Sequence, residues 1–212
     1  MKVLVACEES QRVCTAFREK GHEAYSCDII DQSGGHPEWH IMQDVLPLLN
    51  GNCEFETTDG IKHKINGKWD LIIAHPPCTY LSNAGARFLY PKGVLNKERL
   101  QKGLIAKNFF ISFYNADCDK ICIENPIPSK IYSLPQYTQI IQPYEFGHPY
   151  SKKTCLWLKG LQILKPTNIV PEDERQSTKI AGNWFNKGGK NRQRNRAKTF
   201  PGIAKAMAEQ WS

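Results

Sequence analysis

The chain has 212 residues, of which 41% are hydrophobic and 10% aromatic. That apolar content suits one domain with a full core and excludes a disordered chain. Lysine and arginine number 28 against 21 acidic residues, so the net charge is +7. No apolar stretch approaches the ~18 residues of a membrane span, and the first residues lack a cleavage site, so we expect neither a membrane span nor a signal peptide.

Strand-like apolar runs alternate with helical patterns along the chain. Strands are predicted at residues 2–7, 24–27, 71–74, 121–123 and 154–158, and helices from a Ser10 cap to about Lys20, at 97–115 and at 203–211. Residues 54–66 alternate around a central Asp-Gly and predict a hairpin. This alternation favours an α/β fold, a mostly parallel sheet with helices on both faces, and we find no boundary that would divide residues 1–212 into two domains.

Ligands of such sheets bind beyond the carboxyl ends of the strands, so the residues after each predicted strand are candidates for a site. The first strand is followed by Glu8-Glu9-Ser10 and the second ends at Asp28. The strand at 71–74 is followed by His75-Pro76-Pro77-Cys78, and the one at 121–123 by Glu124-Asn125-Pro126. Acids and a cysteine therefore collect along one predicted edge.

Cys78 and Glu124 are the candidates for chemistry at this edge. Two prolines stiffen the chain before Cys78, which makes its thiol a candidate nucleophile if its surroundings lower its pKa; the alternative is a structural free cysteine. Glu124 follows an apolar strand, so we expect partial burial, a raised pKa and a role as general acid. The alternative for Glu124 is a carboxylate bonded to a neighbouring loop.

The predicted second strand ends at Asp28, where nucleotide-binding α/β proteins place the acid that receives ribose hydroxyls. The first loop has no Gly-x-Gly, which argues against a dinucleotide and permits a ligand without phosphates. His36 and His40 have the spacing of two metal ligands, but no third accompanies them, and we predict no metal. The eight cysteines lie singly, which predicts reduced thiols in a cytoplasmic protein.

Residues 186–198 carry most of the net charge. This basic tract has no acid and six basic residues: Lys187, Lys190, Arg192, Arg194, Arg196 and Lys198. Such a tract suits a polyanion such as DNA or RNA. The alternative is a solvated, mobile loop.

The combination of a strand followed by Pro-Pro-Cys and a strand followed by Glu-Asn resembles the DNA cytosine-5 methyltransferases, whose signatures are Pro-Cys and Glu-Asn-Val. Residues 146–157, FGHPYSKKTCLW, are similar to the family's aromatic-Gly-x-Pro-Gln-x-Arg-x-Arg motif, and the order of all the motifs agrees. The resemblance covers roughly residues 1–160 and the C-terminal helix. It implies a Rossmann-like fold that uses S-adenosylmethionine.

The resemblance also implies roles for individual residues. Cys78, in the loop with Pro77, would be the nucleophile, Glu124 the partner of cytosine N3, Asn125 a loop organiser, and Lys152 or Lys153 a positive charge near the base or phosphate. The implied contacts of S-adenosylmethionine are Cys7, Glu8, Glu9, Ser10, Asp28, Ile29, Asp44, Val45 and Pro76. The implied reaction adds the thiolate to C6 of cytosine and transfers the methyl group to C5.

Three departures from the family pattern stand out. The Gly-rich cofactor loop is replaced by Val5-Ala6-Cys7-Glu8-Glu9-Ser10, and the motif's arginines are replaced by lysines, which lose bidentate geometry. The chain is also short for a separate target-recognition domain. Only about residues 161–200, with the basic tract, could take that place, a pattern that resembles small cytosine methylases of phage-like genomes.

We therefore expect a cytoplasmic DNA cytosine-5 methyltransferase of a bacterial or phage-infected cell, with its oligomeric state left open. The acceptor could be double-stranded DNA, single-stranded DNA or a free cytosine nucleotide, and a donor of another group at C5 is compatible with the same thiol addition. The alternative of another class is a nucleic-acid-binding protein on a methyltransferase scaffold that has lost its activity.

Overall fold

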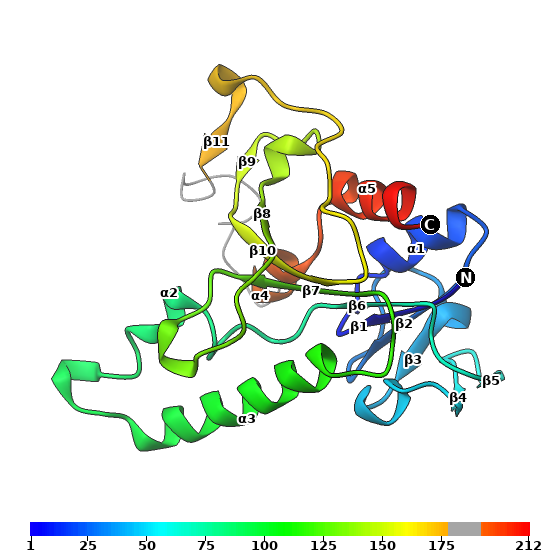
Figure 1. Cartoon of the computed structure of the whole chain (residues 1–212), viewed down its shortest axis with the longest axis horizontal. Helices are drawn as coiled ribbons and strands as arrows, with labels where there is room; N and C mark the ends of the chain where they lie inside the picture. The colour runs from blue at the N-terminus through cyan, green and yellow to red at the C-terminus, as the bar shows by residue number, and fades with distance from the viewer. Residues whose placement is uncertain (178–191) are drawn as a thin grey trace.

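The computed structural model describes residues 1–177 and 192–212, and it is built around a seven-stranded sheet (Figure 1). The strand order is β3-β2-β1-β6-β7-β10-β8. All the pairings from β3 to β7 are parallel, whereas β10 is antiparallel to both of its neighbours. The strands are β1 (Lys2–Ala6), β2 (Glu23–Asp28), β3 (His40–Met42), β6 (Leu71–Ala74), β7 (Ile121–Pro126), β8 (Gln139–Ile141) and β10 (Thr154–Lys159).

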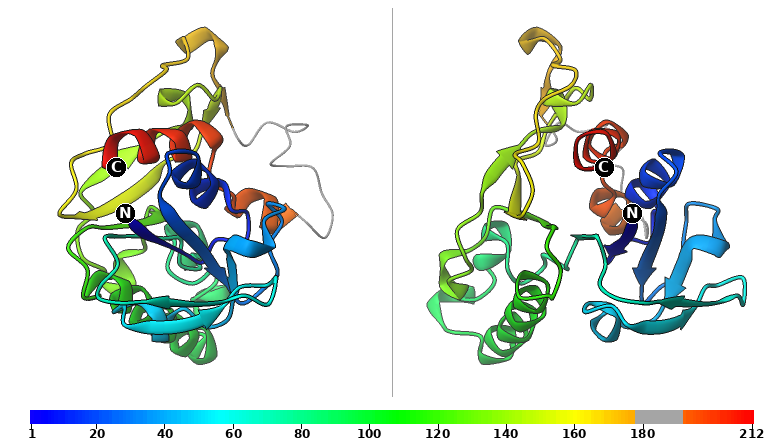
Figure 2. Two further views of the ribbon diagram at one scale, coloured as in Figure 1. Left: turned by 90° about the vertical axis from the view of Figure 1, so that its right-hand side faces the viewer. Right: turned by 45° about the vertical axis from the view of Figure 1, so that its right-hand side comes forward.

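Helices cover both faces of the sheet, as the sequence predicts (Figure 2). Side chains of β1 alternate, so that Val3 and Val5 join the core with α1 (Arg12–Glu19) and α5 (Pro201–Trp211). Leu4 and Ala6 join the core on the opposite face, which contains Phe110 of α3 (Lys97–Tyr114). This alternation follows from the two-residue period of a strand and makes a three-layer α/β architecture.

Smaller elements surround this framework. The hairpin predicted at 54–66 is confirmed as β4 and β5, and two short strands, β9 and β11, pair with each other. Their bounds are β4 (Cys53–Glu56), β5 (Lys62–Ile65), β9 (Tyr150–Ser151), β11 (Gln176–Ser177), α2 (Asn83–Ala86) and α4 (Arg192–Ala197). Single 3-10 turns lie at Pro37–Trp39, Leu46–Leu48, Pro91–Gly93, Lys130–Tyr132, Pro143–Glu145 and Glu172–Glu174.

The start of α1 differs from the prediction. Ser10 is not its cap: Gln11 precedes the helix in the left-handed region, at φ 57°, without a side-chain cap bond. The carboxylate of Glu8 instead accepts hydrogen bonds from the backbone N–H groups of Val13 at 2.7 Å and Cys14 at 3.1 Å. A carboxylate satisfies free N–H groups at a helix start and complements the helix dipole, so Glu8 replaces the predicted cap.

Part of the basic tract is helical. Residues 192–197 form α4, while Lys187 and Lys190 lie outside the described residues. All eight cysteines are unpaired. Within the described ranges, no helix has the length and apolar character needed to span a membrane.

The two ends of the chain lie side by side (Figures 1 and 2). The imidazole of His22 lies between them, with Nδ1 3.4 Å from the amino group of Met1 and Nε2 2.8 Å from Oγ of Ser212. The first strand and the last helix are therefore neighbours in space.

Candidate active site

Three neighbouring parallel strands, β1, β6 and β7, bring the candidate residues to one edge of the sheet. Glu8 and His75 follow the ends of β1 and β6, and the backbone N–H of His75 donates to the carbonyl of Ala6 at 2.9 Å. Strand β7 continues to Pro126, so Glu124 lies within the second half of that strand rather than after it. These are carboxyl ends, where ligands of open α/β sheets bind.

The loop that carries Cys78 is tied to β7. The buried amide of Asn125 donates from Nδ2 to the carbonyl of Pro76 at 2.7 Å. On its far side, the carbonyl of Cys78 accepts from the N–H of Ser82 at 3.0 Å. Pro76 is buried, whereas Pro77 is exposed. The Asn125 contact is what a loop-organising residue would make.

The thiol of Cys78 is partly buried, and charges of both signs act on it. Burial raises its pKa above the ordinary value; the cations of Lys152 and Arg196 act against that shift, and the carboxylate of Glu124 adds to it. The sequence-based hypothesis requires a lowered pKa, whereas the protein without a substrate has a raised one. Cys78 is therefore mainly a protonated thiol until something changes its surroundings.

Glu124 titrates in the direction opposite to the predicted one. Burial alone would raise its pKa, but the charge and bonding of His75, the charge of Lys152 and a hydrogen bond from Thr199 outweigh it and lower the pKa. Nδ1 of His75 lies 3.0 Å from Oε2 of Glu124, and Oγ1 of Thr199 donates to the same oxygen at 3.2 Å. The prediction of a raised pKa is wrong because the partner was not visible in the sequence.

His75 is the residue that the sequence-based site omitted. Its side chain is 10% exposed. Burial alone would lower its pKa, but the carboxylates of Glu124 and Glu8 outweigh that effect and raise it. The signal that could have identified it is its position: it is the first residue after β6, level with the acids after β1 and in β7.

A second group of side chains lies at the ends of β1, β2 and β3, where the resemblance implies the cofactor. Cys7 has φ 58°, in the left-handed region that glycine favours. Burial raises the pKa of Cys7, and the nearby Asp28, Cys27 and Asp44 raise it further, so these groups lie close together. Ile29 is exposed, Asp44 is exposed, and Val45 is buried.

Glu8 and Ser10 are less suited to holding a cofactor than the resemblance implies. Both are buried, and the two carboxylate oxygens of Glu8 are occupied by the backbone of α1. Oγ of Ser10 lies 3.5 Å from Oε1 of Glu8. Glu8 therefore holds the start of α1, and Ser10 contacts Glu8 rather than the helix backbone.

Glu9 connects the implied cofactor edge to the basic tract. Its Oε2 lies 2.8 Å from Nη2 of Arg194, and its Oε1 lies 3.8 Å from Nζ of Lys198. Arg194 also donates to the carbonyl of Asp31 at 3.1 Å, and Lys198 to Oγ of Ser33 at 2.9 Å. Two of the predicted DNA-binding cations therefore contact the protein itself.

The remaining charged candidates lie near Cys78. Nζ of Lys152 donates to the carbonyl of Arg196 at 3.0 Å, which joins the β9–β10 connection to α4. The side chain of Arg196 is exposed, and so is Lys153. Lys152 and Arg196, rather than Lys153, are the cations that act on the thiol of Cys78.

The two histidines with metal-ligand spacing are engaged elsewhere. His36 pairs with Glu38 at 3.0 Å, while the ring nitrogens of His40 contact Oγ of Ser26 and the carbonyl of Ile30, both at 2.9 Å. In the part of the chain that the structure describes, no group of three or more His, Cys, Asp or Glu side chains could hold a metal ion.

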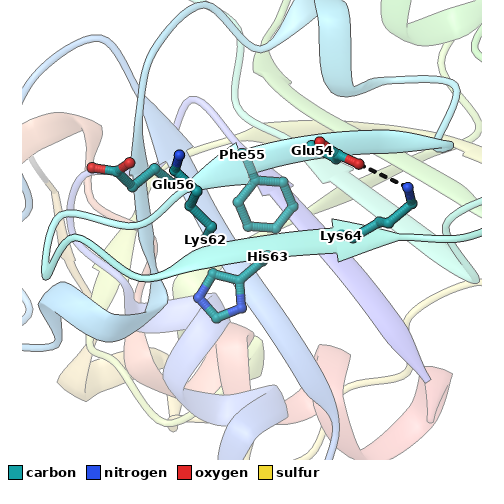
Figure 3. A pocket seen from close by; sticks show the side chains of 6 residues that line it. All are labelled: Glu54, Phe55, Glu56, Lys62, His63 and Lys64. Carbon is teal, nitrogen blue, oxygen red and sulfur yellow. Dashed lines mark hydrogen bonds and ion pairs between the residues drawn. The ribbon is translucent and has the colours of Figure 1, made fainter.

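A pocket of about 380 Å³ lies on the β4–β5 hairpin (Figure 3). The side chains that line it are those of Glu54, Phe55, Glu56, Lys62, His63 and Lys64. Glu54 and Lys64 pair across the hairpin at 2.7 Å. None of these side chains belongs to the predicted site, and we assign the pocket to the hairpin's own packing.

The sheet order defines the class of fold. Five parallel strands are extended by β10 and β8, with β10 reversed between two strands that run the other way. This is a Rossmann-like α/β arrangement, as the sequence predicts. The order reverses between β1 and β6, which is the type of switch point where such sheets bind ligands.

No protein-family model matches the chain, and no curated protein matches it. Among solved structures, the chain is similar to one described as a DNA modification methyltransferase encoded within a prophage of E. coli, with 15% sequence identity and a TM-score of 0.45. The similarity covers 81% of this chain and 52% of that one, so the chain spans about half the length of that structure.

Proposed function

We propose that this protein transfers a methyl group from S-adenosylmethionine to C5 of cytosine in DNA, through an adduct between Sγ of Cys78 and C6 of the base. One observation carries the proposal: the Cys78 loop after β6 is tied to β7 beside Glu124 by the hydrogen bond from Asn125 to Pro76, and the charges of Glu124 and Lys152 act on the thiol. This reaction needs two groups: a thiol that can act as the nucleophile, and a carboxyl group that faces N3 of the cytosine ring.

The edge at β1, β2 and β3 suits the donor. Asp28 and Asp44 are acids at or after the carboxyl ends of β2 and β3, where they offer acceptors for hydroxyl and amino groups and a negative field for a cationic ligand. The carboxylate of Glu9 is already paired with Arg194. Asp28 and Asp44 are the residues that would hold the ribose and the adenine. When bound, S-adenosylmethionine supplies an electrophilic methyl group.

The chemistry follows from the groups around Cys78. The thiol of Cys78 first loses its proton to solvent. The thiolate then adds to C6, and the π electrons move through C4 onto N3, where Glu124 faces the developing charge. C5 becomes nucleophilic and accepts the methyl group. Loss of the C5 proton to solvent and departure of the thiolate then restore the ring. Inside a duplex the target base must first be flipped out of the stack.

Covalent trapping tests the proposal. DNA that carries 5-fluorocytosine should form a stable adduct with the protein in the presence of S-adenosylmethionine, because fluorine at C5 cannot be lost as a proton is. Denaturing gels and intact-mass measurement would show the adduct on Cys78, and Cys78→Ser should abolish it while cofactor binding measured by calorimetry persists. Cys53→Ser, a partly buried thiol on the hairpin, is the matched control and should trap as wild type does.

The same experiment separates the rival functions. Duplex, single-stranded and mononucleotide substrates, compared by mass spectrometry of the product, identify the acceptor and the group added at C5. An adduct that persists in Cys78→Ser contradicts the assigned nucleophile. Binding to DNA without any binding of S-adenosylmethionine would instead support a non-catalytic nucleic-acid-binding protein.

Glu124→Gln tests the partner of N3. We expect the methylation rate to fall by a factor of about 10² or more, the usual scale for loss of an acid–base group, with little change in DNA binding. Glu54→Gln, an exposed acid on the hairpin, is the control. A wild-type rate in Glu124→Gln would leave Glu124 with only a structural role.

A further inference from the structure

The charge state of Glu124 leaves the proposed reaction without a proton source. Addition of the thiolate to C6 puts electrons on N3, and N3 must then take a proton. Glu124 is 13% exposed and has a lowered pKa, so it is ionised before the substrate arrives. A carboxylate accepts hydrogen bonds and has no proton to donate.

His75 lies where that proton could be held. Its Nδ1 is 3.0 Å from Oε2 of Glu124, and the carboxylate of Glu8 also acts on its ring. Two backbone N–H groups of α1 fix Glu8 in place. Lys152 is the cation that opposes the two carboxylates at this position.

The ring nitrogens of His75 are unusual for buried polar atoms. Although Nδ1 is in ion-pair contact with Glu124, neither nitrogen has an aligned hydrogen-bond partner among the residues that the structure describes. Buried polar atoms normally have such partners, and an exception calls for an explanation. A proton that is transferred only when a substrate is present is an explanation consistent with this geometry.

We propose that His75 holds a proton as an imidazolium between Glu8 and Glu124, and passes it through Glu124 to N3 of cytosine as Cys78 adds to C6. The proposal rests on the cytosine chemistry proposed above, and it makes His75 a positioning residue that acts through Glu124. Its raised pKa agrees with this assignment.

The proton transfer balances over the cycle. As the Sγ–C6 bond forms, Nδ1 of His75 gives its proton to Oε2 of Glu124, Glu124 protonates N3, and His75 becomes neutral. After C5 has been methylated and has lost its proton to solvent, N3 returns its proton through Glu124 to His75 while the Sγ–C6 bond breaks. The C5 proton carries away the positive charge that the sulfonium donor brings.

The first test measures the charge of His75 without any reaction. Imidazole resonances of the wild-type protein, with His75 assigned by comparison with His75→Gln, should show that ring still protonated at a pH where an ordinary histidine is neutral. In Glu124→Gln the same ring should lose its proton at a lower pH. A His75 that is neutral at pH 6.5 in the wild-type protein overturns the proposal.

The second test measures the rate of trapping by 5-fluorocytosine DNA against pH. In wild type this rate should rise as Cys78 ionises and then fall as His75 loses its proton. In His75→Gln the rate should be at least tenfold lower at neutral pH and should keep rising at alkaline pH, a change that a purely structural role would not produce. His22→Gln, at the joined chain ends, should keep the wild-type profile.

The outcomes distinguish the two proposals. A wild-type protein that forms no adduct overturns the cytosine chemistry, whatever the state of His75. An adduct that forms with the wild-type pH profile in His75→Gln overturns the role of His75 alone. If His75→Gln does not fold, the imidazole resonance whose titration changes in Glu124→Gln identifies His75, and its protonation in the wild-type protein still decides the proposal.

Discussion

Glu8 and Glu124 show how one residue type acquires two tasks at the same edge of a sheet. Burial raises the pKa of Glu8 despite its hydrogen bonds to the backbone of α1, while the ion pair with His75 lowers the pKa of Glu124. Both carboxylates are nearly buried. The charge of His75 acts on both carboxylates, but only Glu124 is in direct contact with the ring, and Lys152 and Thr199 also lower the pKa of Glu124.

Asp28 and Asp44 test the cofactor edge at the level of single residues. Asp28→Ala and Asp44→Ala should each weaken S-adenosylmethionine by about 1.5–3 kcal/mol, the usual cost of losing a hydrogen bond to a charged group. Calorimetric titration would measure both, with Asp117→Ala, a surface acid paired with Lys68, as the control. Unchanged affinity in both variants would show that the donor binds elsewhere.

The positions of the candidate residues in the fold were predicted from sequence better than their charge states. Cys78, Glu124 and Asp28 lie at or just after the ends of apolar runs, and such runs are visible in the sequence from local hydrophobicity. The pairing of Glu124 with His75 depends on β6 and β7 being neighbours, which the chain order alone does not fix. For the same reason, the bond from Arg194 to Glu9 was not predicted: it joins residues far apart in the sequence.

At the scale of elements, Gly103 allows α3 to pack closely against Tyr132, because glycine has no side chain. A Cβ on Gly103 would collide with the ring of Tyr132. Gly103→Ala should gain about 1 kcal/mol of helix propensity but lose about 1–3 kcal/mol through overpacking. We expect a net loss of stability, measured by denaturant unfolding.

A double-mutant cycle supplies the control for this prediction. In the background of Tyr132→Ala, the added methyl group meets no ring, so Gly103→Ala should become neutral or stabilising. Destabilisation by the same amount in both backgrounds would show that the ring is not the cause.

Helix α4 revises what the basic tract can contribute to DNA binding. Arg194 is paired with Glu9, whereas Arg196 is exposed beside the Cys78 loop. Arg196→Gln should therefore flatten the plot of log affinity against log salt by about one unit for duplex DNA, at about 0.9 per phosphate contact. Arg194→Gln is the matched control and should leave the slope unchanged. Equal flattening in both variants would show that the pair with Glu9 opens when DNA binds.

Element boundaries were harder to predict than element types. The predicted strand at 71–74 agrees with β6, and the predicted helix at 97–115 ends one residue later than α3. Strands β3 and β8 were not predicted, because three residues are too few to show a period of two. The start of α1 was misassigned because Glu8, three residues before Gln11, acts as its cap.

Across the whole molecule, the pair of His75 and Glu124 makes stability depend on pH in a defined direction. The lowered pKa of Glu124 contributes stability that is present above its ordinary value of 4.5 and is lost as pH falls through the folded-state value. The raised pKa of His75 contributes stability that is complete below 6.5 and is lost as pH rises through its folded-state value. The pair therefore stabilises the fold most between these two ordinary values.

Thermal unfolding at a series of pH values tests this dependence. From pH 6.5 upward, the melting temperature of wild type should decline more steeply than that of His75→Gln, because only the wild-type protein has this imidazolium to lose. His22→Gln should follow the wild-type curve. Parallel curves for wild type and His75→Gln would contradict a protonated His75 in the folded protein.

Because both chain ends contact His22, the chain is suited to circular permutation. A short linker from Ser212 to Met1 would close the backbone into a ring, because the ends already meet at one imidazole. New chain ends could be made by cutting the closed backbone in the turn between β4 and β5, where Asp59 and Gly60 are exposed and belong to no strand. Such a circular permutant would begin on the hairpin and keep Cys78, His75 and Glu124 on the same strand ends, because the sheet depends on neighbours in space rather than on the starting residue.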